Sequence, residues 1–172
     1  KSQKVNLKNI DRNGKENISL YAFISNKVSV VFSDEYGNEI SSFIMNKTDK
    51  MEIIWDRIPN ITQKEGYEGK FISEYTQEEI SRDDEAGAND RYYLFYTPIE
   101  YQVIYHNLTE EEIESLALPT SRTVESGESL PHKTFVRVGY TFEGFYTQNE
   151  GGQKIESIPA GIGDYHVYIR LT

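Results

Sequence analysis

The sequence has no cysteine among its 172 residues, and it is poor in basic residues and in long apolar runs. Without cysteine it has neither the disulfide framework of most small secreted eukaryotic modules nor a thiolate ligand for zinc. Lysine and arginine number 18 against 28 aspartates and glutamates, which gives a formal net charge of −10. That charge disfavours nucleic acid and anionic membrane surfaces as partners. No run approaches the roughly 18 apolar residues of a membrane span, so we expect no membrane insertion.

The chain begins at Lys1 with neither a methionine nor an apolar leader. We therefore expect a fragment or a processed piece whose targeting signals lie outside this sequence. Tyrosine, with 13 residues, and phenylalanine, with 8, are abundant. Each buried ring removes roughly 150–250 Å² from water, which helps a small module to form a core. An acidic, cysteine-free and tyrosine-rich chain favours a bacterial surface over a eukaryotic secreted module.

The chain nearly repeats itself. Three anchors recur in the same order at offsets of 71 to 73 residues: Val30–Phe32 with Val103–Tyr105, Gly66–Tyr67 with Gly139–Tyr140, and Tyr75–Glu79 with Tyr146–Glu150. Such an offset predicts an internal duplication of a small module. We predict three parts: residues 1–26 as the tail of an upstream repeat, 27–98 as a divergent module, and 99–172 as a second module. The junction at Pro98-Ile99 carries no flexible Gly/Ser linker.

The second copy predicts a mainly β module with one short helix. Thr109 and Glu112 have the spacing of a capping box, which predicts a helix over about 110–117 that ends before Pro119. Alternating and β-branched segments predict extended structure at 101–105, 121–125, 135–138, 140–146 and 165–171. Turns are expected at 126–127, 149–152 and 161–164, and residues 153–158 predict either a short turn or a strand.

The first copy predicts a hairpin of 28–33 with 39–46, an extended segment at 66–73 and a closing strand at 92–97. Met51, Ile54, Trp55 and Ile58 follow helical spacing, so we expect a helix over about 49–57, capped by Asp49 or Thr48. The two helices do not superpose under a shift of 73 residues. Either one of them is wrong or the copies carry insertions at different loops.

The first 26 residues echo the end of the second copy. Gln3–Val5 is similar to Gln153–Ile155, and Ser19–Phe23 is similar to His166–Arg170. A lone closing strand leaves backbone groups unpaired. We therefore predict that residues 20–23 pair with a neighbouring strand.

The second copy resembles the Listeria–Bacteroides repeat, which is similar to the B-repeat of internalins. The resemblance rests on Gly139–Thr147, the Gly151-Gly152 turn, Lys154-Ile155, Ser157–Gly161, Gly163-Asp164 and the terminal Val167–Ile169. Phe145 stands where the family usually has tryptophan, and residues 27–98 match weakly. The resemblance implies an α+β fold of tandem β-grasp, ubiquitin-like modules. It also implies tandem copies in bacterial surface proteins and no enzymatic activity.

Several candidate sites have a simpler structural explanation. One candidate is a glycan-stacking platform made by Tyr140, Phe142, Phe145 and Tyr146, with residues 140, 142 and 146 on one face of a strand. An aromatic motif that is repeated in each module favours the core instead. Trp55 on its helical stripe also favours the core. The acidic residues Asp83, Asp84, Glu85 and Asp90 match no calcium-loop spacing, and Asp34-Glu35 favours a hairpin turn.

The remaining polar residues form no recognisable catalytic pattern. Glu110, Glu111 and Glu112 are explained by the positive end of a helix dipole. His106, His132 and His166 lack the helical spacings of a zinc site. Gly161-Ile-Gly163 lacks the strand-to-helix context of a dinucleotide site. We predict no catalytic, cofactor-binding or metal-binding residue.

These patterns and the resemblance predict a non-catalytic, extracellular repeat segment of a bacterial cell-surface or secreted protein. We expect it to act as a spacer or stalk, and the resemblance also implies adhesion, which is the role of some family members. Its expected partners are adjacent repeats of the same chain. The alternative is a dedicated module for a glycan or a host protein, which predicts an exposed aromatic or apolar patch that is not repeated in both copies. The third class of function is a fragment of an enzyme whose catalytic domain lies elsewhere in the chain.

Overall fold

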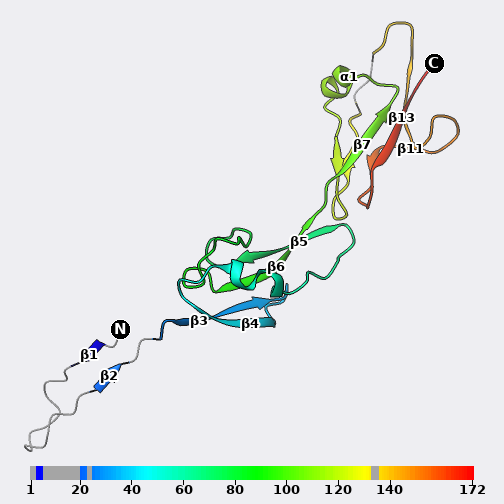
Figure 1. The fold of residues 1–172 in the computed structure, drawn as a ribbon. Coiled ribbons are helices and arrows are strands. Elements are labelled where there is room, and N and C mark those ends of the chain that lie inside the picture. The colour runs from blue at the N-terminus through cyan, green and yellow to red at the C-terminus, as the bar shows by residue number, and fades with distance from the viewer. Residues whose placement is uncertain (1–2, 6–19, 23–24, 133–135) are drawn as a thin grey trace, which may run out of the picture. The chain divides into compact units, whose positions relative to one another are not determined.

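The computed structural model describes residues 3–5, 20–22, 25–132 and 136–172. Strands predominate among them and helices are few, so the chain is mainly β as predicted (Figure 1). The chain divides into two compact units. The first comprises Lys1–Asn60 and Lys70–Phe95, and the second comprises Ile61–Gly69 and Tyr96–Thr172.

The N-terminal unit is built on a sheet with the strand order β4-β3-β6-β5. The predicted hairpin is confirmed: β3 pairs antiparallel with β4, from Lys27↔Asn46 to Ser33↔Glu39. The Asp34 carboxylate closes its turn by accepting the backbone N–H groups of Tyr36 and Asn38 at 2.9 and 2.8 Å. The central pair, β3 with β6, is parallel. The strands are β3 (Lys27–Ser33), β4 (Glu39–Asn46), β5 (Tyr67–Ser73) and β6 (Arg91–Pro98), which confirms the segments predicted at 66–73 and 92–97.

A short helix, η1 (Met51–Arg57), follows the hairpin where a helix was predicted, but it is a 3₁₀-helix. Because a 3₁₀-helix repeats every three residues, Met51 and Ile54 share the buried side, while Trp55 and Ile58 are rotated away and only half-buried. The prediction that Trp55 belongs to the core is therefore wrong.

The predicted cap of this helix is also wrong. Lys50 occupies the N-cap position without a side-chain hydrogen bond, and the Asp49 carboxylate instead accepts from the backbone and side chain of Asn46. The free N–H groups of the first turn are satisfied by a distant loop: Met51 donates to the carbonyl of Asp84 at 2.9 Å and Glu52 to that of Arg82 at 3.0 Å.

The C-terminal unit contains a five-stranded sheet with the order β11-β10-β13-β7-β8 and a smaller pair, β12 with β9. Its central pair is again parallel, with Tyr165↔Val103 to Tyr168↔His106 in register between β13 and β7. The strands are β7 (Tyr101–His106), β8 (Ser121–Arg122), β9 (Glu128–Ser129), β10 (Phe142–Tyr146), β11 (Lys154–Ile155), β12 (Ser157–Ile158) and β13 (Tyr165–Leu171). The first and closing strands of the second copy are thus confirmed.

Two of the predicted extended segments differ from the structure: one is shorter than expected, and the described part of the other is not a strand. After Arg122, the Thr123 hydroxyl accepts the N–H groups of Glu125 and Ser126, and this local turn ends β8. The segment predicted at 135–138 begins at Phe135, which lies outside the described residues. Beyond it, Arg137 and Tyr140 form an isolated bridge around a turn, with Gly139 at φ +85°, so this stretch is not a strand.

The predicted helix of the second copy is confirmed as α1 (Glu110–Ser115). Its capping box is complete: Thr109 Oγ1 accepts the N–H of Glu112 at 3.3 Å, and the Glu112 carboxylate accepts the N–H of Thr109 at 2.8 Å. α1 lies between the first and second strands of its module, β7 and β8, whereas η1 lies between the second and third strands, β4 and β5. Both helices therefore exist, and they occupy different connections.

We expect the Glu112→Gln variant to lose part of the acid dependence of stability in the C-terminal unit. The Arg137 guanidinium, 2.6 Å from the carboxylate, and the cap at Thr109 hold the pKa of Glu112 below its usual range. A depressed folded-state pKa gives stability that is present above the unfolded-state pKa and is lost as pH falls through the folded value. Thermal unfolding of both proteins between pH 7 and pH 3 measures the difference. Equal slopes in the acid range would contradict the assignment.

The turn predicted at Ser126-Gly127 lies against the backbone of a second loop. A Cβ on Gly127 would lie 2.7 Å from the Ala160 nitrogen and would also collide with the Ile158 carbonyl oxygen. These are main-chain atoms, so relief requires a shift of the loop. We expect Gly127→Ala to lower the free energy of unfolding by about 1–3 kcal/mol, measured by chemical denaturation. Ser126→Ala is the matched control, and a similar loss in both variants would refute this explanation.

The N-terminal pair confirms the predicted pairing of residues 20–22, while Phe23 lies outside the described residues. β1 (Gln3–Val5) pairs antiparallel with β2 (Leu20–Ala22), with Lys4 opposite Tyr21. The strands that these segments echo, β11 and β13, are separated by β10 in the C-terminal sheet. The origin of residues 1–26 as the tail of an upstream repeat stays a prediction.

Candidate functional site

The aromatic signature of the second copy does not form one face. β10 has an irregularity between Phe142 and Gly144, with Gly144 at φ +140°, and this bulge reverses the alternation of side chains. Phe142 and Phe145 consequently pack edge to face, with ring centroids 5.4 Å apart, and Phe145 is 5% exposed in the core. The predicted common face of residues 140, 142 and 146 is therefore wrong. Tyr140 is 57% exposed, and Tyr146 lies under the Arg170 guanidinium, 3.8 Å from its ring centroid.

Three of the four acidic residues that sequence analysis considered for calcium are engaged with separate partners. Asp83 forms an ion pair with Lys50 at 2.8 Å, and Asp84 accepts the Tyr92 hydroxyl at 3.0 Å. Asp90 accepts from a third group, the hydroxyl of Tyr75. Within the described residues, no group of three or more His, Asp or Glu side chains is arranged to hold a metal ion. The backbone of this loop caps η1, which gives the segment a structural role.

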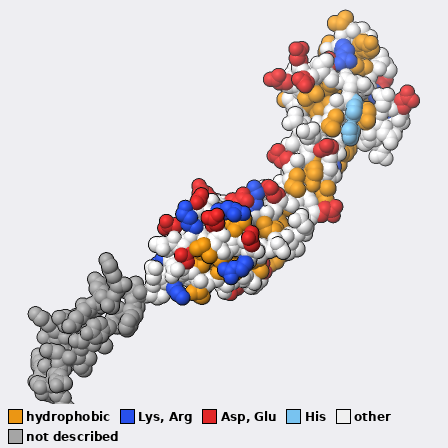
Figure 2. Space-filling model, in the orientation of Figure 1, with side chains coloured by type: hydrophobic (Ala, Val, Ile, Leu, Met, Phe, Trp, Pro, Cys, Tyr) orange, Lys and Arg blue, Asp and Glu red, His pale blue; other side chains and the backbone are white. Residues whose placement is uncertain are grey.

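Two of the histidines come together although they are 60 residues apart. His106 Nε2 lies 2.8 Å from His166 Nδ1, and the His106 ring stacks on Tyr168 with centroids 4.3 Å apart. The parallel pairing of β7 with β13 creates this cluster, and Figure 2 shows the histidines as one patch on the surface of the C-terminal unit. His132 lies elsewhere, beside a smaller cavity. Sequence spacing missed the pair because the two residues come from different strands.

The Gly161-Ile-Gly163 segment is a turn held by an arginine. Arg122, 8% exposed, donates to the backbone carbonyls of Pro159, Ile162 and Gly163 at 2.8 to 3.1 Å. Its guanidinium also lies 4.8 Å from the ring centroid of Tyr165. Sequence analysis gave no role to this residue. Its place between Ser121 and Thr123, in a polar stretch, offered no signal that it would be buried.

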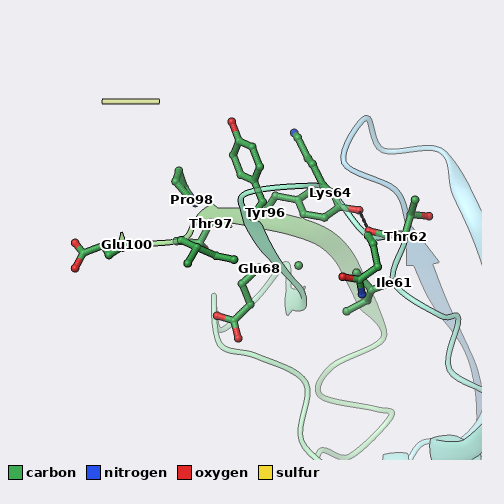
Figure 3. A pocket seen from close by; sticks show the side chains of 12 residues that line it. Ile61, Thr62, Lys64, Glu68, Tyr96, Thr97, Pro98 and Glu100 are labelled. Carbon is green, nitrogen blue, oxygen red and sulfur yellow. Dashed lines mark hydrogen bonds between the residues drawn. The ribbon is translucent and has the colours of Figure 1, made fainter. Parts of the chain in front are cut away.

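A cavity of about 610 Å³ lies at the ends of β5 and β6 (Figure 3). Two tyrosines from these strands, Tyr67 and Tyr96, form its aromatic part, with ring planes 80° apart and centroids 6.5 Å apart. Lys64 places its Nζ 4.4 Å from the Tyr67 centroid and 5.0 Å from that of Tyr96. Sequence analysis did not identify this corner. The lining residues are Ile61–Lys64, Tyr67–Gly69 and Tyr96–Glu100.

The tyrosines are fixed in place. The Tyr96 hydroxyl donates to the Thr62 carbonyl at 2.6 Å, as the dashed line in Figure 3 marks, and the Tyr67 hydroxyl donates to Glu125 at 2.7 Å. Gly69 allows the close approach, since a Cβ there would lie 2.8 Å from the Tyr96 ring. The corner is therefore formed before any ligand arrives. Chemically, it offers ring faces, carboxylates and hydroxyl groups, which suits non-covalent binding.

Comparison of the chain with family models, with curated proteins and with solved structures finds no match. In the part of the chain that the structure describes, no helix has the length and apolar character to span a membrane.

Proposed function

We propose that this chain is a segment of tandem β-grasp modules that serves as a load-bearing spacer in a bacterial cell-surface or secreted protein. The proposal adopts the resemblance of residues 101–172 to the Listeria–Bacteroides repeat, with its extracellular location and with adjacent repeats as its partners. Its mechanism is mechanical: the modules hold another part of the protein at a distance and resist extension.

One observation carries the proposal: the first and last strands of each module lie side by side and parallel at the centre of the sheet. β3 pairs with β6 in one module and β7 with β13 in the other. The second strand flanks the first, as β4 flanks β3 and β8 flanks β7, and a further strand flanks the last. The same arrangement in both copies supports descent from one β-grasp module.

This arrangement resists force in a specific direction. Tension on the two chain ends of a module pulls the first and last strands along each other, so the ladder bonds between them are loaded together. An antiparallel hairpin pulled at its open end would lose its bonds one by one. Because forced unfolding is governed by the unfolding rate, this geometry matters to a stalk even where equilibrium stability is modest.

Single-molecule pulling at the chain ends tests the proposal. We expect two separate unfolding events, each releasing roughly 20 nm, since about 70 residues extend by up to ~3.6 Å each and the folded length is subtracted. Attachment through Lys27 and Asn46, which lie opposite each other at the open end of the β3–β4 hairpin, is the matched control for unzipping. The end-to-end geometry should require the higher force. Equal forces in the two geometries, or extension without a force peak, would rule out a load-bearing role.

A further inference from the structure

The corner between Tyr67 and Tyr96 already holds a cation, the side chain of Lys64. We propose that this corner binds a cationic side chain, a lysine or its methylated form, presented by a partner protein, and that Lys64 fills the site when the partner is absent. The inference goes beyond a spacer function, because a spacer needs no ligand.

The geometry is that of a cation site with two aromatic walls. The Lys64 Nζ lies within 5.0 Å of both ring centroids, and the rings meet nearly at a right angle. An ammonium within about 6 Å of a ring centroid is attracted by the negative face of the ring, and recognition of methylated ammonium groups uses this attraction. The corner therefore provides two such attractions at one point.

The charge around the corner favours a cation over an anion or a neutral sugar. Lys64 is the only basic residue among those that line the cavity, whereas Glu68 and Glu100 are both part of its wall. When Lys64 leaves, the wall keeps its carboxylates and hydroxyl groups. A sugar ring would need one broad uncovered aromatic face, whereas the two rings here stand edge to face.

Exchange of Lys64 for an incoming cation does not involve the buried core. Lys64 is exposed and belongs to the segment before β5. The hydrogen bonds of the Tyr67 and Tyr96 hydroxyls hold the rings in place during the exchange. A pre-formed site loses less entropy on binding. The cavity, about 610 Å³, also has room for the alkyl stem and neighbouring residues of the incoming segment.

Titration of the isotope-labelled full chain with N-acetyl-trimethyllysine methyl amide, followed by NMR, tests the inference. We expect shifts at residues 61–69 and 96–100 and an affinity in the millimolar range. A neutral isostere with carbon in place of the quaternary nitrogen should bind at least fivefold more weakly. Lys64→Ala should tighten binding at least threefold because it removes the internal competitor. Tyr67→Leu should abolish binding. Glu68→Gln changes an exposed residue and should weaken binding at least twofold, so it still tests the inference if Tyr67→Leu fails to fold.

Four results would overturn the inference. Equal binding of the neutral isostere would mean an apolar hollow, and unchanged affinity in Lys64→Ala would mean that Lys64 is not a competitor. Trp55, which has Arg82 4.8 Å above its ring, is the internal control for unspecific cation attraction. Shifts at Trp55 as large as those at Tyr67 would exclude a specific site. Stronger shifts of the same resonances with a neutral chito-oligosaccharide would assign the corner to sugars instead.

Discussion

Replacement of Phe32 by alanine is expected to lower the free energy of unfolding of the N-terminal unit by about 3–5 kcal/mol. Phe32 is 0% exposed and lies in the middle of an aromatic cluster. Its ring packs edge to face on Phe43 and Phe71, with centroids 6.0 and 5.2 Å away, and stacks on Tyr92 at 5.4 Å. The three surrounding rings belong to β4, β5 and β6, so the cavity left by the substitution would weaken every strand of the sheet at once.

Fluorescence of the single tryptophan makes this measurement specific. Trp55 lies in η1 within the N-terminal unit, so its signal in a urea titration follows this unit. Phe95→Ala is the matched control, because the same side chain on the outer face of β6 is 50% exposed. Its expected effect is within about 0.5 kcal/mol. A loss of less than 1 kcal/mol in Phe32→Ala would contradict the role of this residue as the centre of the core.

Arg122→Ala is expected to destabilise the C-terminal unit by about 3 kcal/mol, because it leaves three backbone carbonyls without the donors that they share. The carbonyls belong to Pro159, Ile162 and Gly163, on the loop that leads into the closing strand β13. Loss of the contact with Tyr165 adds to the effect. The planar guanidinium donates to all three carbonyls and stacks on the ring at the same time. The compact ammonium of lysine lacks this planar set of donors.

Arg122→Lys separates this explanation from a simple need for positive charge. The ammonium keeps the charge but cannot serve three carbonyls and lie flat on a ring, so we expect a loss between those of the wild type and of Arg122→Ala. Amide hydrogen exchange of β13 measures the effect, with the Trp55 transition as the reference for the other unit. Full recovery of protection in Arg122→Lys would show that the charge alone is what matters.

Most strands, both helices and the β3–β4 hairpin followed from local signals in the sequence, whereas the parallel pairings of distant strands did not. Thr109 and Glu112 predicted α1 correctly because a capping box satisfies its own donors within one turn. The helical stripe at Met51 predicted the place of η1 but not its type, because backbone carbonyls from residues 82 and 84 complete its first turn. No local pattern contains that information.

The sites depend even more on distant contacts. The bulge at Gly144 moved Phe142 to the side of Phe145, and alternation alone could not reveal it. The His106–His166 contact and the Tyr67–Tyr96 corner each join two strands that pair in the sheet, so they become visible only with the register. Arg122 is buried because its partners are backbone carbonyls, which carry no side-chain signature in the sequence.

The parallel central strands have a consequence for inheritance. Because β3 and β6 run in the same direction, and β7 and β13 do likewise, the chain enters each module at one end of its sheet and leaves at the opposite end. A gene segment that encodes such a module can be duplicated or deleted in frame by recombination, and every copy still starts and finishes in the same way. A chain of such modules can therefore be lengthened one module at a time without reversing the direction of the chain.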